Sequence, residues 1–196
     1  MKRKIVSVAS LLMLALTTST FAQKFKVLEG DKKAVKDAKQ FNLVFEYNNM
    51  MVGKETEADY VAEKKEDYNK KEAGKGDDWE KNWKENRTTK FEPQFVELFN
   101  KYGEGMQVGN LSTAPYTMKV ATTYTKPGFN IGITKQYALI DGEITVTETA
   151  HPEKVILKMS FKGAQGTTFG DYDFDAGTRI KEAYAKLGKE LAKELN

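Results

Sequence analysis

The chain has 196 residues, with 31 Lys and Arg, 28 Asp and Glu, one His, no Cys and a formal net charge of +3. The absence of Cys excludes disulfides, thiol catalysis and zinc–thiolate sites. Three of the basic residues lie at positions 2–4, so residues 23–196 carry 28 basic and 28 acidic side chains and are formally neutral. A neutral chain lacks the basic surface of a nucleic-acid-binding protein, and we expect no nucleic-acid partner.

The first 22 residues have the pattern of a secretory signal peptide. The basic residues 2–4 precede an apolar run over residues 5–16, and a small-residue segment ends at Ala22. The run is shorter than the roughly 20 apolar residues that a membrane-spanning helix needs, and no Cys follows it for lipidation. We predict cleavage after Ala22, a periplasmic or secreted protein without a transmembrane span, and one α/β domain over residues 23–196.

Residues 23–113 predict two strands followed by a helical insert. Residues 25–28 form a short strand, and residues 41–47 form a stronger one in which Phe and other apolar side chains alternate with polar ones. The insert, residues 55–102, reads as three helices with thin apolar stripes on a highly charged background. Asp77 or Asp78 is the predicted N-cap of the second helix.

Three consecutive strands are predicted over residues 116–125, 136–148 and 154–162. Their side chains alternate between apolar and polar, which is typical of a sheet with one buried face, and Thr125 is placed on the polar face. Asp141-Gly142 interrupts the second strand, either as a hairpin turn or as a bulge. A bulge is favoured, because the apolar side chains stay in phase on both sides of it.

Residues 175–196 predict a helix that covers this sheet. Asp175 is its expected N-cap, and the apolar side chains recur at the helical period. They are Ile180, Ala183, Tyr184, Leu187, Leu191 and Leu195. The predicted fold is therefore α+β, or open α/β, with one mixed and mostly antiparallel sheet, a helical insert and a C-terminal helix packed on the sheet.

Trp79 and Trp83 are the first candidate binding residues. Their spacing of four residues places both indoles on the same side of a helix. Such a pair can form an exposed platform for a sugar or a membrane contact. Aromatic side chains at helical spacing more often pack in the core, and packing is the favoured interpretation.

Acidic residues at the start of the last helix are candidate calcium ligands. Asp171, Asp173 and Asp175 alternate, and Glu182 lies where a twelve-residue calcium loop would place its last ligand. Such a loop requires Gly at its sixth position, which is Ala176 here. A capped turn with solvated carboxylates is the favoured interpretation, so we predict no cofactor, with calcium as the alternative.

Other catalytic patterns are absent from the sequence. The single histidine, His151, lies in a predicted turn and reads as a surface residue. No nucleophile elbow, zinc-protease pattern or phosphate-binding glycine loop occurs.

Several local patterns resemble uncharacterised secreted proteins of Gram-negative bacteria. The patterns are Glu57-Ala58-Asp59-Tyr60, Gly74-Lys75-Gly76-Asp77 with Trp79 and Trp83, Phe91-Glu92-Pro93-Gln94-Phe95, Pro127-Gly128, and Arg179-Ile180 with Ala183-Tyr184 and Gly188-Lys189. The order of elements is also similar to envelope modules such as the amino-terminal domain of TolB and the lipoprotein activators of penicillin-binding proteins. That resemblance implies a module that binds proteins and is not an enzyme, although this chain has a longer insert and no lipidation cysteine.

Three functions follow as hypotheses. The first is a non-catalytic envelope module that binds a protein or another envelope component through the insert and its two tryptophans. The second is a small-ligand binder with an apolar pocket between the sheet and the insert. The third is a hydrolase that uses a carboxylate pair or a metal at the acidic turn.

Overall fold

The computed structural model describes residues 23–130, 134–166 and 175–196, so the predicted signal peptide lies outside the described residues. The helices are α1 (Glu57–Lys71), α2 (Lys75–Asn86), α3 (Glu92–Tyr102) and α4 (Ala176–Leu195), with a 3₁₀ turn η1 (Lys32–Val35) and a π-helical turn η2 (Arg87–Phe91). The strands are β1 (Lys24–Gly30), β2 (Gln40–Glu46), β3 (Met51–Val52), β4 (Glu55–Thr56), β5 (Gln107–Gly109), β6 (Tyr116–Lys126), β7 (Phe129–Asn130), β8 (Lys135–Gln136), β9 (Leu139–Glu148) and β10 (Val155–Gln165).

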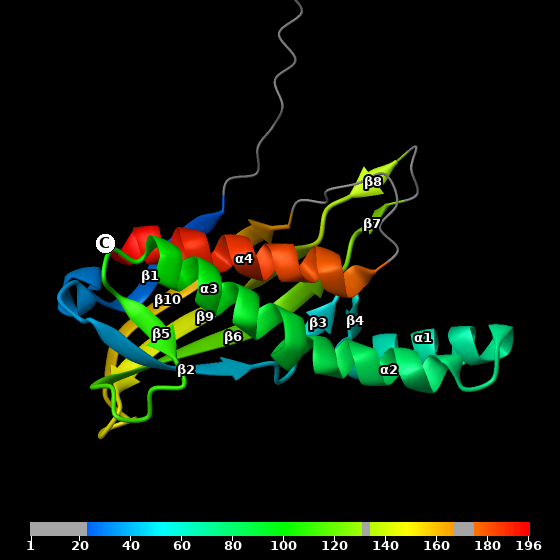
Figure 1. Ribbon diagram of the computed structural model, residues 1–196, viewed down its shortest axis with the longest axis horizontal. Coiled ribbons are helices and arrows are strands. Elements are labelled where there is room, and N and C mark those ends of the chain that lie inside the picture. The colour runs from blue at the N-terminus through cyan, green and yellow to red at the C-terminus, as the bar shows by residue number, and fades with distance from the viewer. Residues whose placement is uncertain (1–22, 131–133, 167–174) are drawn as a thin grey trace, which may run out of the picture.

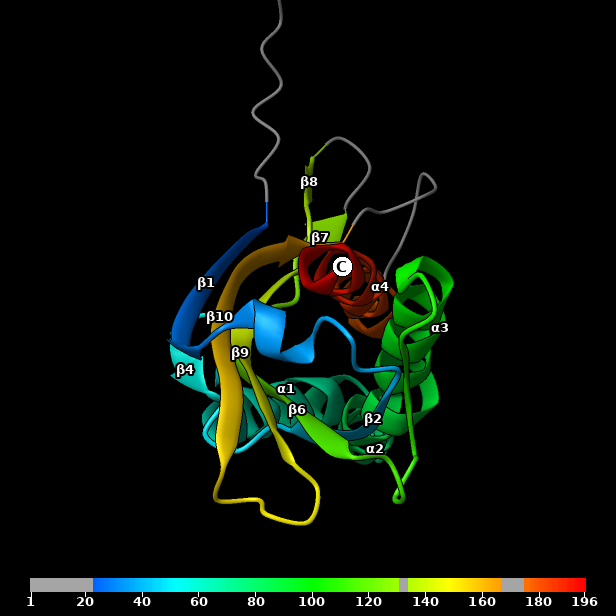
Figure 2. The same cartoon turned by 90° about the vertical axis from the view of Figure 1, so that its left-hand side faces the viewer.

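The fold is α+β with one mixed sheet, as the sequence predicts (Figure 1). Its main strand order is β1-β10-β9-β6-β2-β5, and β7 and β8 form a separate small hairpin. The pairs β1–β10, β10–β9 and β9–β6 are antiparallel, whereas β2 runs parallel to both β5 and β6. Figure 2 shows the sheet curving around α4, with α3 beside that helix.

Helix α4 supplies much of the apolar core. Asp175 caps it as predicted, because its side chain accepts a hydrogen bond from the Gly177 N–H. Every apolar side chain that was predicted to face the sheet is buried, and Leu187 and Leu191 are fully inaccessible. Burial of such an aliphatic side chain contributes about 1.5–3 kcal/mol. The C-terminal helix is therefore a principal source of the stability of the fold.

Strand β9 runs through Asp141-Gly142 without turning, and the irregularities lie in its neighbours. The register shifts between Thr122 and Tyr124 in β6, and again between Phe161 and Ala164 in β10. A Cβ at position 142 would lie 2.0 Å from the Ala121 carbonyl oxygen and 2.7 Å from the Phe161 ring. Glycine is therefore required where the two neighbouring strands approach β9.

One strand prediction was wrong because of the bulge in β6. Thr125 was placed on the polar face, but it is buried at 2% exposure, while Thr123 is exposed. The extra residue at position 123 reverses the alternation for the end of the strand. The second predicted strand is also divided, because Gln136 belongs to the β7–β8 hairpin and β9 begins at Leu139.

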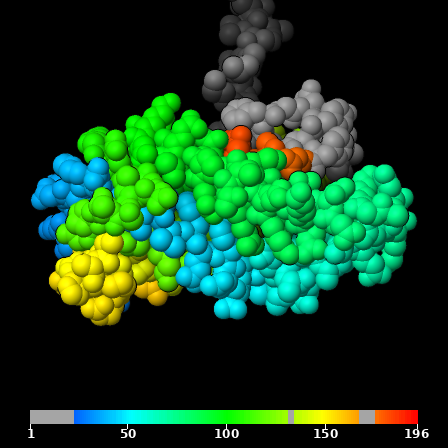
Figure 3. Space-filling model, turned by 60° about the horizontal axis from the view of Figure 1, so that its bottom comes forward, coloured from blue at the N-terminus to red at the C-terminus, as the bar shows by residue number. Residues whose placement is uncertain are grey.

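The helical insert is confirmed, and its first two helices project beyond the sheet (Figures 1 and 3). We call α1 and α2 the helical arm. The predicted cap of α2 was wrong: the helix begins at Lys75 after Gly74, which has φ 86° and lies in the left-handed region. Asp77 and Asp78 instead occupy the first turn. Carboxylates there also stabilise the helix, because they interact favourably with the positive end of its dipole. The π-helical turn η2 then connects α2 directly to α3.

Candidate functional site

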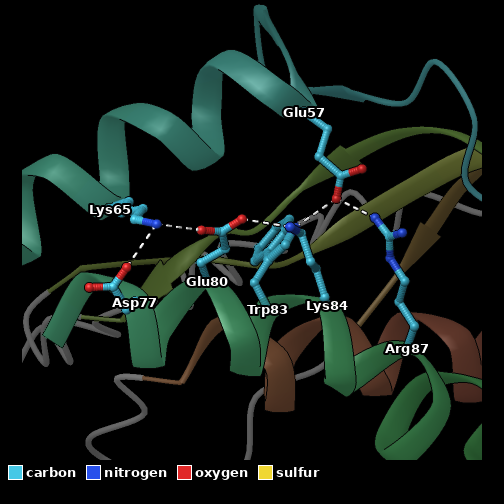
Figure 4. A network of polar contacts seen from close by, with 7 residues as sticks. All are labelled: Glu57, Lys65, Asp77, Glu80, Trp83, Lys84 and Arg87. Atoms are coloured by element: carbon cyan, nitrogen blue, oxygen red, sulfur yellow. Dashed lines mark hydrogen bonds and ion pairs between the residues drawn. The ribbon is translucent and has the colours of Figure 1, made fainter. Parts of the chain in front are cut away.

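Ion pairs on the surface of the arm join its two helices (Figure 4). The Lys65 Nζ lies 2.8 Å from the Asp77 Oδ1 and 3.0 Å from the Glu80 Oε2. The other carboxylate oxygen of Glu80 pairs with the Lys84 Nζ at 2.5 Å. Hydrogen bonds from these lysines lower the pKa of Asp77 and of Glu80. The network joins α1 to α2, but its ion pairs are exposed, so solvent weakens their contribution to stability.

A second group of polar contacts holds the base of the arm. The Glu57 carboxylate accepts a hydrogen bond of 2.7 Å from the Trp83 indole N–H and forms an ion pair with Arg87 (Figure 4). The Arg87 guanidinium in turn lies 4.3 Å from the centre of the Tyr47 ring. These contacts connect the start of α1 to the end of α2 and to the segment after β2.

Four aromatic rings pack together within the arm. Trp79 stacks against Trp83 with ring centres 5.5 Å apart and against Tyr68 at 5.8 Å, and Tyr60 contacts both tryptophans. Trp83 is only 6% exposed, whereas Trp79 is half-buried. The two tryptophans share one side of α2, as their spacing predicts. Their ring faces are engaged with protein, so they do not form an exposed flat platform.

The aromatic group borders a hollow between the arm, the turn after β6 and the start of α4. The hollow has a volume of about 430 Å³, which falls in the range of about 300–1,000 Å³ that is usual for ligand sites. Its lining residues are Tyr60, Lys64, Tyr68, Trp79, Asn82, Trp83, Asn86, Pro127, Gly128, Asp175, Ala176, Gly177 and Arg179. Three distant parts of the sequence therefore build one concave site.

The charged groups at this hollow have partners within the protein. Asp175 accepts hydrogen bonds from the Lys90 Nζ at 2.7 Å, the Thr178 hydroxyl at 2.8 Å and the Gly177 N–H at 2.8 Å. Burial alone would raise the pKa of Asp175, but these hydrogen bonds outweigh it and lower that pKa. Arg179 is buried and donates to the carbonyl oxygens of Pro127 and Gly128 at 2.9 and 3.2 Å.

The predicted calcium ligands are only partly described. Asp175 serves as the helix cap, and Glu182 forms an ion pair of 3.2 Å with Lys181. Among the residues that the structure describes, no three His, Cys, Asp or Glu side chains gather to hold a metal ion. Asp171 and Asp173 lie outside the described residues, so the calcium loop, which was the less favoured interpretation, stays an untested alternative.

A buried polar cluster that the sequence did not predict lies beneath the arm. The Tyr47 hydroxyl donates to Glu92 at 3.2 Å, and the Tyr184 and Thr122 hydroxyls lie 2.6 Å apart. Burial raises the pKa of Glu92 and of both tyrosines. The cavity here is about 10 Å³, which holds at most one water molecule. Residues so far apart in sequence carry no local signal of this cluster. We interpret it as a structural junction, because its hydrogen bonds join the segment after β2 to α3 and join β6 to α4.

Another hollow, of about 650 Å³, lies at the other end of the molecule between η1, β2 and β5. It is an open groove with one aromatic ring, that of Tyr116, and few converging side chains. The hollow beside the arm is therefore the better candidate site.

The single histidine lines neither of these hollows. His151 is exposed in a turn, as predicted, and its Nδ1 lies 3.5 Å from the Glu153 carboxylate.

Comparisons with known proteins add little. No protein-family model matches the chain, and no curated protein sequence matches it. It is similar to PelC from a dodecamer of Paraburkholderia phytofirmans, with 10% identity, 87% of this chain and 97% of that chain covered, and a TM-score of 0.40. A point variant of that PelC gives 9% identity, coverage of 85% and 98%, and a TM-score of 0.35. Likenesses this low support no functional argument, and the resemblance to TolB and the lipoprotein activators stays a prediction.

Among the described residues, no helix is long and apolar enough to cross a membrane.

Proposed function

We propose that the protein is an exported, non-catalytic binding module of the cell envelope, and that its ligand occupies the hollow between the helical arm and the start of α4. The observation that carries this proposal is the hollow itself, which has the volume of a ligand site and is lined by aromatic and hydrogen-bonding side chains from three elements. The small-ligand hypothesis expected an apolar pocket between the sheet and the insert, whereas this hollow lies between the insert, the turn after β6 and the start of α4 and has a mixed lining.

The carboxylates support binding over hydrolysis. Asp77 and Glu80 have lowered pKa values because they pair with lysines on the exposed arm. Glu92 has a raised pKa, but it faces the closed junction and not the hollow. A hydrolase would place a carboxylate with a raised pKa beside the substrate as a general acid. Asp175, the one carboxylate among the described residues that line the hollow, has a lowered pKa instead.

The distribution of exposed apolar side chains supports a concave site over a flat apolar interface. Among the described residues, the large exposed ones are Val27, Leu28, Val44, Met51 and Phe129. They lie on four strands and do not gather on the arm. A docking surface for a protein partner would place such side chains in one patch.

A crystallographic fragment screen tests the proposed site. Crystals soaked in mixtures of small neutral, cationic and anionic fragments should show density for bound fragments in the hollow. Emission of the two tryptophans, which both border the hollow, should shift with the same fragments in solution. Fragments that bind elsewhere and never in the hollow would overturn the proposal. The variant Asn82→Phe, which places a ring in the hollow, should lose both signals.

The proposed export has its own test. Mass spectrometry of the protein recovered from a periplasmic fraction should give a chain that begins at Gln23. An intact amino terminus, or recovery only from the cytoplasm, would contradict the predicted signal peptide.

A further inference from the structure

Resting on the proposed function, we infer that the hollow takes an uncharged, hydroxyl-rich ligand of the saccharide class. The side chains that line the hollow fall into two groups by their charge and by the hydrogen bonds they already make. The charged ones are already engaged with protein groups, whereas the neutral ones have free hydrogen-bonding capacity.

The charged side chains at the hollow are compensated. Asp175 is held by Lys90, Thr178 and a backbone N–H, and Arg179 donates to two backbone carbonyls. The Lys64 Nζ lies 3.2 Å from Glu63 and 5.6 Å from the centre of the Tyr60 ring. Among the described residues that line the hollow, a charged ligand would meet no uncompensated opposite charge. It would lose its hydration on entering the hollow, and no ion pair would offset that cost.

The neutral hydrogen-bonding side chains have no such partners. Within the described part of the chain, no hydrogen bond involves the side chains of Tyr60, Tyr68, Asn82 or Asn86, or the indole N–H of Trp79. All five side chains line the hollow. Amides and phenols can both donate and accept, and the indole can only donate. The hollow therefore offers donors and acceptors that are mixed together.

A ligand hydroxyl matches such a mixture because it also donates and accepts. A phosphate or carboxylate only accepts hydrogen bonds, and a quaternary ammonium has none to give. Cationic ligands also prefer open aromatic ring faces. Here the faces of Trp79 are stacked on Tyr68 and Trp83, and Lys71 lies 5.3 Å from the centre of the Tyr68 ring. The mixed donors and acceptors therefore favour a saccharide over an anion, and the engaged ring faces disfavour an ammonium ion.

Tryptophan emission provides the test, because both tryptophans border the hollow. The purified protein is titrated with neutral oligosaccharides of glucose, galactose and N-acetylglucosamine, with choline, and with inorganic phosphate, at constant ionic strength. At least one oligosaccharide should give a saturable shift, and choline and phosphate should give none at equal concentration.

Two variants locate the signal. Asn82→Ala and Tyr68→Phe each remove one hydrogen-bonding group and should weaken oligosaccharide binding about threefold to tenfold, which is the effect of one neutral hydrogen bond. The control variants Asn110→Ala and Tyr124→Phe change the same residue types outside the hollow and should bind as the parent does. Binding that is unchanged in Asn82→Ala and in Tyr68→Phe would overturn the assignment.

The outcomes separate this inference from the proposed function. If choline or phosphate binds in preference to every oligosaccharide, and Asn82→Phe abolishes that binding, the saccharide class is wrong and the binding site stands. If no oligosaccharide binds while fragments occupy the hollow in crystals, the saccharide class is again wrong, but the proposed binding site stands. If neither fragments nor any of these probes enter the hollow, both proposals fail.

Discussion

The helical arm and the body of the molecule, which comprises the sheet with α3 and α4, are held together by different interactions. In α4, ten of the twenty residues are buried, and the large apolar ones among them form the core with the sheet. In α1, Val61 is the one buried residue among fifteen. The arm depends instead on stacked rings, on the contacts of Glu57 and on ion pairs at its surface.

This difference implies two levels of stability within one chain. Burial of aliphatic side chains contributes about 1.5–3 kcal/mol each, whereas exposed ion pairs contribute at most about 1 kcal/mol and are screened by salt. Segments with few buried contacts open at a lower free energy than the core. The arm should therefore open before the body does. Because the hollow uses walls from both, ligand binding should stabilise the arm more than the body.

The largest expected effect comes from a charge placed in the body. Leu187 is fully buried in α4, so Leu187→Asp forces an unpaired carboxylate into the core. The free energy of unfolding should fall by more than about 4 kcal/mol, and circular dichroism during urea titration should show no cooperative transition. Lys186→Asp, on the half-exposed side of the same helix, is the control. A folded Leu187→Asp protein would show that α4 contributes less than its burial indicates.

The next largest effect should be confined to the arm. Trp83→Ala removes a buried ring and its hydrogen bond to Glu57, and such changes cost about 3–5 kcal/mol. Hydrogen exchange should accelerate across α1 and α2 while amides of β9 and α4 keep their protection. Trp83→Phe, which retains a ring, should show a smaller change. Equal loss of protection in the arm and in α4 would mean that the two regions unfold as one unit.

A smaller effect is expected from Gly142→Ala in the body. The added methyl would approach the Ala121 carbonyl and the Phe161 ring, and overpacking of this kind costs about 1–3 kcal/mol. Urea denaturation should give a lower midpoint with the same slope. Thr145→Ala, on the outer side of the same strand, should leave the midpoint nearly unchanged. An unchanged midpoint in Gly142→Ala would show that the bulged neighbours can move apart.

The body was largely predictable from the sequence, because its elements carry long periodic patterns. The apolar positions of α4 and the alternation in β9 and β10 recur over ten or more residues, so one irregular position does not hide the period. Thr125 was misplaced because the alternation changes at the bulge before it, which lies next to the pairing of Thr122 with Gly142 of another strand. The local pattern of residues in β6 does not predict an irregularity that involves a second strand.

The arm and its hollow were less predictable. The spacing of Trp79 and Trp83 placed both rings on one side of α2, but it did not distinguish the buried ring from the half-buried one. That distinction depends on Tyr60 and Tyr68, which come from the other helix of the arm. The walls at Gly128 and Gly177 lie still further along the chain. Sequence reasoning could find the aromatic residues of the site, but not the concave surface that they border.

The smallest effect, and the one that most directly separates arm from body, is the response to acid. Lysine partners lower the pKa of Glu66, Asp77 and Glu80 on the arm below their ordinary values of 4.5, 3.8 and 4.5. The opened arm therefore binds more protons than the closed arm in this range, and the stability from these pairs is lost as the pH falls through the lowered pKa values. Burial raises the pKa of Glu92, so its contribution has the opposite sign and is lost as the pH rises.

Acid should accordingly destabilise the arm more than the body. Tryptophan emission, which reports on the arm, should change at a higher pH than the circular dichroism signal of the whole protein. Lys65→Ala removes the partner shared by Asp77 and Glu80, so its arm should open more readily at neutral pH and depend less on acid. Lys36→Ala, which changes an exposed lysine with no ion pair among the described residues, should behave as the parent. If emission and circular dichroism change together in both variants, the ion pairs do not set the stability of the arm, and the stacked rings are what hold its two helices together.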